Sequence, residues 1–445
     1  MGLMAIFLVD FANLFYISLL GKQELAAAIG YAGTILFFNI SICIGIMISA
    51  IALVSRALGA GDRERARKVA GSSIIFLLIL TIIIAGTFLP FIGTVVGWLG
   101  ATGETKEIAT NFLLIVVPSM PLLGLGMASS GLLRAVGDAR RAMYVTLVGG
   151  LVAAILDPIF IFTFDLGIYG AAYVVILTRL IMTIIGLFFV VKVHDLLSMP
   201  SFAQLTEDIK KLADIAFPAV LTNIATPVGN AFVTAAIAPF GDDAVAAWAV
   251  IGRLIPVAFG FIFALSGAIG PIVGQNYGAG ITDRVRETVI KSLWVTVAYT
   301  LFVWFVLILV QDIIIENFNI SGEAAELVAF FINFVTLSFL FNGIMFVANA
   351  AFNNLGYATY STALNWGKAT IGTIPFVWAG ASIAGAHGVL AGQGLGSVVF
   401  GIVSIWVALK VVEKIGKEKP KGPPPPPLWR AAISAFSSGK GANLS

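Results

Sequence analysis

Long apolar stretches dominate the chain, and short segments with charged residues, glycine or proline separate them. Most of these stretches are long enough for a helix that crosses the hydrocarbon core of a bilayer, which takes about 20 residues. Because lipid offers no hydrogen bonds to the backbone, such stretches form helices, whereas a β-barrel would show short alternating segments. We predict about 12 spans, at residues 2–20, 26–54, 70–98, 108–133, 140–164, 168–190, 213–239, 244–274, 287–311, 323–352, 359–380 and 386–411.

Basic residues gather in alternate loops between these stretches. The loops after the second, fourth, sixth, eighth and twelfth spans hold Arg56, Arg63, Arg65, Arg67 and Lys68; Arg134, Arg140 and Arg141; Lys192, Lys210 and Lys211; Arg284 and Arg286; and Lys410, Lys414 and Lys417. The other loops hold Lys22, Lys106 and several acids, such as Asp165 and Glu316. Lysine and arginine are enriched in the cytoplasmic loops of membrane proteins, so we expect these basic loops and both termini to be cytoplasmic.

Four short sequences recur in the same order in the two halves of the chain, displaced by about 220 residues. Gly21 to Ala27 matches Gly241 to Ala247, Gly59 to Gly61 matches Gly278 to Gly280, Gly137 matches Gly356, and Gly167 to Gly170 matches Gly385 to Gly388. With six spans in each half, both halves enter the membrane in the same sense. The repeat axis then lies along the membrane normal, with the substrate cavity between the halves.

We therefore predict an all-α integral membrane protein with about 12 transmembrane helices in two pseudo-symmetric six-helix bundles. The first bundle covers residues 1–192 and the second covers residues 213–413, with residues 193–212 as a cytoplasmic linker. Residues 414–445 contain the run Pro423 to Pro427 and are expected to be a disordered cytoplasmic tail.

The composition is typical of a protein whose solvent is lipid. Hydrophobic residues make up 59% of the chain and charged residues 11%, whereas about a quarter of a soluble domain is charged. The net charge of +3 is spread among apolar runs, so no nucleic-acid partner is expected. A single cysteine, Cys43, excludes an intramolecular disulfide, and His194 and His387 lie far apart, so we expect no metal site. The start, Met1 to Val9, lacks the basic region and cleavage site of a signal peptide.

Two carboxylates, Asp10 and Asp157, lie inside predicted spans. A charged carboxylate at membrane depth costs several kcal/mol unless it is protonated, paired or hydrated. Binding or release of a proton at either residue would change a buried charge and allow helix packing to switch; a purely structural role in helix packing is the alternative for Asp157. Pro158 has no backbone N–H and favours a bend beside Asp157.

Polar and basic residues inside other spans are further candidates. Arg179 lies in the sixth span, where it either pairs with Asp157, joins a proton relay, or reaches the cytoplasmic boundary. Asn365 and Lys368 stand three residues apart in the eleventh span and share a face that can point toward substrate. Asn230 stands in the second half where Asp10 stands in the first. Interhelical hydrogen bonding is the alternative role for the asparagines.

Several segments carry a family resemblance. Leu132 to Ala142, Leu156 to Ile161, Leu166 to Ala172 and Gly274 to Gly280 together resemble the loops and helix ends of the multidrug and toxic compound extrusion (MATE) family. The resemblance covers the chain up to the tail. The Asp157-Pro158 pair, without an acid in the second-half spans, is similar to the DinF-type branch.

The resemblance implies two bundles that form a V and a secondary antiporter that exchanges organic, often cationic, compounds for H⁺ or Na⁺. It also implies that carboxylates on the first and fifth helices carry the coupling. Asp157 matches the fifth-helix position, whereas the first-helix position is Asn13, with Asp10 about one turn earlier on roughly the same face. Ala153 and Val175 replace family side chains that help to ligate Na⁺, which favours H⁺.

We therefore expect an exporter of small organic compounds, located in the inner (plasma) membrane, monomeric, and without an organic cofactor. The tail sequence Gly439-Lys440-Gly441 lacks the upstream glycine of a P-loop, so ATP hydrolysis is not expected. A lipid or lipid-linked oligosaccharide flippase is the alternative, with basic groups such as Lys368 or Arg179 in its cavity. A membrane enzyme would need a cluster of nucleophilic or acid–base groups that the sequence does not show.

Overall fold

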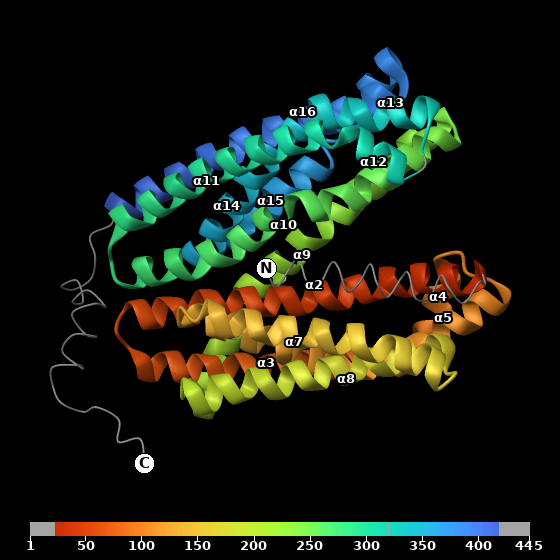
Figure 1. Ribbon diagram of the computed structural model, residues 1–445. Coiled ribbons are helices and arrows are strands. Elements are labelled where there is room, and N and C mark those ends of the chain that lie inside the picture. Colours follow the sequence, from red (N-terminus) through yellow and green to blue (C-terminus); the bar gives the residue numbers. More distant parts are fainter. Residues whose placement is uncertain (1–22, 319, 418–445) are drawn as a thin grey trace.

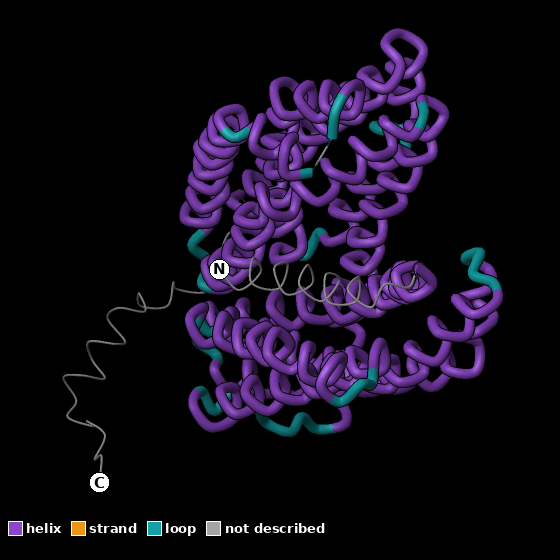
Figure 2. The backbone as a smooth tube through the Cα atoms, turned by 45° about the vertical axis from the view of Figure 1, so that its right-hand side comes forward, coloured by secondary structure: helices purple, strands orange, loops and turns teal. Residues whose placement is uncertain are grey.

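The computed structural model describes residues 23–318 and 320–417, and this part of the chain is helical without a strand (Figures 1 and 2). The first half contains α2 (Gln23–Gly59), α3 (Arg63–Phe88), η1 (Leu89–Phe91), α4 (Ile92–Trp98), α5 (Gly103–Val116), η2 (Val117–Ser119), α6 (Met120–Ala135), α7 (Ala139–Pro158), η3 (Ile159–Thr163), α8 (Gly167–Phe188) and η4 (Phe189–Val193). The second half contains α9 (Phe202–Ile237), η5 (Ala238–Phe240), α10 (Asp242–Gly278), α11 (Thr282–Leu309), α12 (Gln311–Asn317), α13 (Gly322–Phe330), η6 (Phe331–Val335), η7 (Thr336–Ser338), α14 (Phe339–Leu355), α15 (Ala358–Ala369) and α16 (Ile374–Lys417).

The predicted spans from the second to the twelfth are all helical. Ten segments of the described chain are long and apolar enough to cross a membrane, and one of them, Ala358–Lys417, contains two predicted spans. The turn between these two spans lies inside α16, where Ala384 and Gly385 leave helical geometry. Gly385 has a φ of +57°, a conformation that glycine adopts without strain. The predicted first span and residues 418–445 of the predicted tail lie outside the described residues, whereas residues 414–417, also predicted as disordered tail, form the last turn of α16.

The helices form two bundles (Figure 1). One bundle contains α2 to α8 and the other contains α10 to α16, and the two come together at one end and splay apart toward the other. The joined end carries the α2–α3, α6–α7, α10–α11 and α14–α15 turns and is called the basic end below. Each bundle has its own buried apolar core, and large apolar side chains on the outer surface, such as Trp294, Phe302 and Trp378, are exposed. An apolar exterior of this kind suits lipid.

Helix α9 passes from one bundle to the other. Its N-terminal turns pack on α3, and further along its length Gly45 of α2 lies against it, so close that a Cβ there would be 2.8 Å from Ala216 O. On its other side α15 bonds to it, because Thr362 Oγ1 donates to Pro218 O at 2.7 Å and Trp366 Nε1 donates to Leu221 O at 3.0 Å. Helix α9 therefore holds the two bundles together along their shared side.

The segment 193–212, predicted as a linker, is helical from Phe202 onward. A capping box starts the helix, with reciprocal hydrogen bonds between Ser201 and Gln204. Asp208 on the second turn is completely buried, pairs with Arg65 of α3, and accepts from Ser72 Oγ at 2.7 Å. The second half of this segment is thus docked on the first bundle by a buried ion pair.

The α6–α7 turn is held by a second polar group. Asp138 caps α7 by accepting from the Arg141 N–H at 3.0 Å, and it also accepts from the Arg141 guanidinium and contacts His194 Nε2 at 2.8 Å. Burial by itself would raise the pKa of Asp138, but the hydrogen bonds from Arg141 and His194 outweigh it and lower this pKa to about 2. Asp138 therefore stays ionised at any physiological pH and fixes the turn.

We expect Asp208→Asn to reduce the stability of the purified protein, because it leaves Arg65 without its carboxylate. A hydrogen-bonded charge contributes about 1.5–3 kcal/mol, and thermal unfolding in detergent measures the loss. Glu207→Gln is the matched control, since Glu207 is exposed and pairs with Lys211 on its own helix. Equal melting curves for the two variants would contradict the docking role of Asp208.

Candidate functional site

Asp157 is buried inside the first bundle, with 1% of its surface exposed. It lies near the end of α7, about 28 Å along the helix from the Asp138 cap at 1.5 Å per residue. Ala153, one turn earlier, is buried too, and Ile161, one turn later, belongs to the bundle's apolar core. The structure thus places this carboxylate far from the basic end, with a buried apolar side chain one turn before it and another one turn after it.

The hydrogen-bond pattern of this helix changes directly after Asp157. Helix α7 ends at Pro158, and Ile159–Thr163 continues as a π-helix. A proline removes one backbone donor, and π-turns occur often at functional sites because they loosen the helix locally. A change from α to π geometry thus lies beside the buried acid, and the bend at Pro158 stays a prediction.

Arg179 is buried in α8 with 7% of its surface exposed. Its Nη1 donates to Val116 O at 3.1 Å and to Ser119 Oγ at 2.7 Å, where Pro118 interrupts the fourth span between α5 and α6. The pairing with Asp157 that the sequence allowed is not among the contacts of Arg179. Arg179 instead bonds to the chain at the break between α5 and α6, where Val116 O also accepts from Ser119 Oγ at 2.7 Å.

Three side-chain pairs join α14 to α15 in the second bundle. Lys368 Nζ donates to Asn342 Oδ1, Asn365 Nδ2 donates to Asn349 Oδ1 at 3.0 Å, and Ser361 Oγ donates to Asn353 Oδ1 at 3.3 Å. We call these six residues the asparagine ladder. The helices run antiparallel, so residues far apart in the sequence meet in order. Within the described chain Lys368 has no carboxylate partner, and its charge is balanced only by an amide oxygen.

The remaining predicted site residues are not part of the ladder. Asn230 on α9 is exposed, and its backbone oxygen accepts from Thr234 Oγ1 at 2.9 Å. Asp10 and Asn13 lie outside the described residues.

At the basic end each bundle caps a helix of the other bundle. From α2, Arg56 Nε donates to Asn354 O at 2.8 Å and its Nη2 donates to Asn353 O at 3.3 Å. From α10, Gln275 Nε2 donates to Ala135 O at 2.7 Å. These oxygens belong to the last residues of α14 and α6, which have no partner within their own helices. We call this arrangement the reciprocal caps.

The backbones of α2 and α10 cross in direct contact at the same place. A Cβ on Gly59 would lie 2.0 Å from Gln275 O, and a Cβ on Gly278 would lie 2.0 Å from Arg56 O. The guanidinium of Arg56 also lies 5.5 Å from the centre of the Tyr277 ring. No side chain fits between the helices here, so the basic end is closed.

The reciprocal caps were not predicted from the sequence, although the repeat contains them. The shift that places Gly59 on Gly278 also places Arg56 on Gln275, and the shift that places Gly137 on Gly356 also places Ala135 on Asn354. The two caps are therefore equivalent positions of the two halves, each bonded to the other half.

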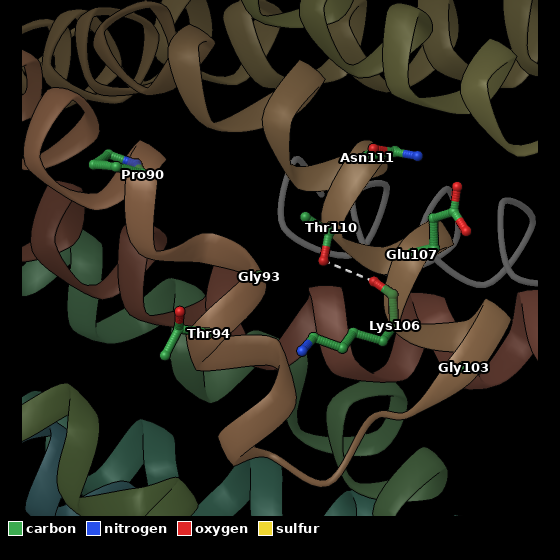
Figure 3. A pocket seen from close by; sticks show the side chains of 8 residues that line it. All are labelled: Pro90, Gly93, Thr94, Gly103, Lys106, Glu107, Thr110 and Asn111. Atoms are coloured by element: carbon green, nitrogen blue, oxygen red, sulfur yellow. Dashed lines mark hydrogen bonds between the residues drawn. The ribbon is translucent and has the colours of Figure 1, made fainter.

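A groove of about 420 Å³ lies between α4 and α5, far from the basic end (Figures 1 and 3). Its lining includes Lys106 and Glu107 with Thr94 and Thr110, and Thr110 Oγ1 donates to Lys106 O at 2.7 Å. The groove contains neither Asp157 nor a ladder residue. It is a feature of the outer corner of the first bundle.

We expect Gly59→Ala, and equally Gly278→Ala, to force the bundles apart at the basic end, because the added methyl group would overlap a backbone oxygen of the other helix. Spin labels on the exposed residues Glu64 and Asp283, in a Cys43→Ala background, report the separation by double electron–electron resonance. The distance distribution should shift to longer values.

Gly252→Ala is the control for this experiment, because nothing lies within 4 Å of a Cβ at this position on α10. It should leave the distribution unchanged. A shift as large in the control as in Gly59→Ala would mean that the contact of α2 and α10 does not hold the bundles together.

Comparison with known proteins agrees with this architecture. The MatE family model matches residues 1–159 and 218–379. The FAD transporter of Shewanella oneidensis is 26% identical over 421 residues, covering 93% of both chains, and the multidrug export protein MepA of Staphylococcus haemolyticus is 26% identical over 419 residues, covering 92% of this chain and 90% of the relative.

Solved structures show the same fold. A mutant of the Vibrio cholerae MATE transporter VcmN has a TM-score of 0.86 with 26% identity, covering 93% of both chains. A transporter of the MOP superfamily from Pyrococcus furiosus has a TM-score of 0.87 with 22% identity, covering 94% of both chains. The predicted all-α fold of two pseudo-symmetric six-helix bundles is thereby confirmed. The chain belongs to the MATE family and is a multi-pass membrane transporter rather than an enzyme.

Proposed function

We propose that this protein exports small organic compounds in exchange for protons by alternating access of the two bundles. The observation that carries the proposal is the burial of Asp157 inside the first bundle, directly before the proline and the π-turn. A carboxylate in such a place is stable when it is protonated, so proton binding and release there change the packing of α7. The multidrug export protein among the relatives supports export as the direction of transport.

The basic end faces the cytoplasm in this proposal. The turns at this end carry clusters of Arg and Lys, which the positive-inside rule assigns to the cytoplasmic side. With the reciprocal caps formed, the described conformation is then closed toward the cytoplasm. Release of substrate to the outside and entry of the proton from the outside belong to this state.

Two observations support H⁺ over Na⁺ as the coupling ion. Ala153 stands one turn before Asp157, and Val175 packs against the same core, so neither position offers an oxygen ligand. Sodium is a hard cation that needs several oxygens, whereas a proton needs only one. Asp10, with Asn13 beside it, is proposed as the second coupling residue on the basis of the family resemblance.

The asparagine ladder is proposed to face the substrate in the second bundle. Its amides offer both donors and acceptors, and Lys368 adds a positive charge that no carboxylate of the described chain neutralises. A fixed cation attracts substrates that carry a carboxylate or phosphate. The FAD transporter of Shewanella oneidensis handles such a molecule, so export of anionic compounds is the second candidate for this protein.

We expect Asp157→Asn to abolish gradient-driven efflux, because the amide cannot take up and release the proton. Proteoliposomes loaded with a fluorescent organic cation, or with FAD, are tested under an imposed pH gradient and, separately, an imposed Na⁺ gradient. Efflux should follow the pH gradient and fall in the variant to the level of protein-free vesicles.

Asp165→Asn, at an exposed turn, is the matched control and should retain efflux. Undiminished efflux by the Asp157 variant would overturn proton coupling at this residue. Export that ignores both gradients would favour the flippase alternative.

We expect Lys368→Met to weaken transport of anionic substrates about tenfold or more, because it removes a hydrogen-bonding charge. Transport of cationic substrates should be retained or improved. The apparent substrate affinity in the same vesicles is the measurement, and Lys291→Met is the control, since Lys291 is exposed and pairs with Glu287. Equal affinity for FAD in both variants would remove Lys368 from the substrate site.

A further inference from the structure

A second groove lies on the outer face of the second bundle, between α15 and α16, and has a volume of about 440 Å³. It lies at the basic end, where α15 begins and α16 ends. Its wall combines apolar side chains with aromatic rings and two lysines: Ala363, Leu364, Val407 and Val411; Tyr357, Tyr360 and Trp406; and Lys410 and Lys414. No acid lines it.

The lysines are held over aromatic rings rather than by carboxylates. Lys410 Nζ lies 4.2 Å from the centre of the Trp406 ring, and Lys414 Nζ lies 5.7 Å from the centre of the Tyr357 ring. Glu413, the acid between them in the sequence, is bonded to Lys417 at 2.6 Å. Within the described residues, neither groove lysine forms an ion pair. Both therefore retain their positive charge for a ligand.

The aromatic wall is fixed before any ligand arrives. Tyr360 packs against the buried Phe352 with ring centres 5.8 Å apart, and Tyr357 lies 5.5 Å from Tyr360. Trp406 and Tyr360 nevertheless remain 57% and 42% exposed. Tyrosine and tryptophan favour the headgroup level of a bilayer, and lysine stems reach from there toward water.

We propose that this α15–α16 groove binds an anionic phospholipid, with the phosphate between Lys410 and Lys414 and the acyl chains along the apolar wall. The groove has positive charge at one part and apolar surface along the rest, and a phospholipid has its charged headgroup and its acyl chains in the same relative positions. Basic pockets between transmembrane helices recognise lipid headgroups in this way. A soluble anion would use the lysines alone and gain nothing from the apolar wall. The groove shares no residue with Asp157 or the ladder, so the inference is independent of the proposed transport function.

Native mass spectrometry of the full chain, titrated with phosphatidylglycerol or with phosphatidylcholine, measures the affinity of each lipid. The wild type should prefer phosphatidylglycerol. At about one kcal/mol for each lysine near a lipid headgroup, Lys410→Ala or Lys414→Ala should weaken that binding about fivefold, and the double variant about 30-fold. Lys291→Ala, an exposed lysine on α11 outside the groove, should leave it unchanged.

A second readout places the lipid at the groove. Phosphatidylglycerol with brominated chains should quench a fluorescence component that Trp406→Phe removes, and brominated phosphatidylcholine should quench it less. The proposal is overturned if the double variant binds phosphatidylglycerol as the wild type does, or if the wild type shows no preference between the lipids. If inorganic phosphate bound as well as phosphatidylglycerol does, the groove would be a site for a soluble anion. If the wild type were a dimer and the double variant were not, the groove would be an interface with a second copy of the chain. Either result also overturns the proposal.

Discussion

The carbonyl groups at the ends of α6 and α14 cannot be satisfied within their own helices, and each takes its donor from the other bundle. This constraint organises the basic end. Arg56 and Gln275 are equivalent positions of the repeat, and both caps lie at the same crossing of α2 and α10. The glycines beneath them, Gly59 and Gly278, remove the side chains that would keep the backbones apart. The closed end is therefore a symmetric contact. In each half, carbonyl oxygens at a helix end accept from a side chain of the other half, and the backbones of α2 and α10 touch beneath them.

The chemistry of the two bundles is unequal, although their backbones repeat. The first bundle buries a carboxylate, Asp157, next to a proline and a π-turn, where the helix has lost part of its regular hydrogen bonding. The second bundle carries the asparagine ladder with Lys368, a polar surface whose charge has the opposite sign. The two halves share the reciprocal caps, yet each half can bind a different ligand. This difference agrees with the proposal that the first bundle binds the ion and the second binds the substrate.

Hydrophobic length predicted the helices from the second span onward, because a bilayer allows few other structures for such stretches. The sequence also placed Asp157 in a span and Lys368 on the face of Asn365, since helical spacing determines both. It could not give the partners of Arg179, Val116 O and Ser119 Oγ, because the two segments meet only in the folded bundle. The capping-box residues Ser201 and Gln204 indicate that a helix starts within the predicted linker. The charged residues around Asp208 led to the prediction of a linker instead. The reciprocal caps required the repeat to be followed residue by residue.

The energies of these contacts can be compared with the energy that the proposed coupling ion supplies. A net hydrogen bond contributes about 0.5–1.5 kcal/mol and one to a charged group about 1.5–3 kcal/mol, so the reciprocal caps together amount to several kcal/mol. One charge that crosses a potential of about 100 mV releases about 2.3 kcal/mol. These net values already include the water that satisfies the freed carbonyls when the end opens. The closed end is thus stable enough to define one state, at a cost of the same order as the energy that the proposed coupling ion supplies. In a salt-bridge network of long side chains, salt would screen the attraction between the charges and the side chains could pair in several ways. The two helix caps and the backbone crossing, by contrast, are either formed or broken.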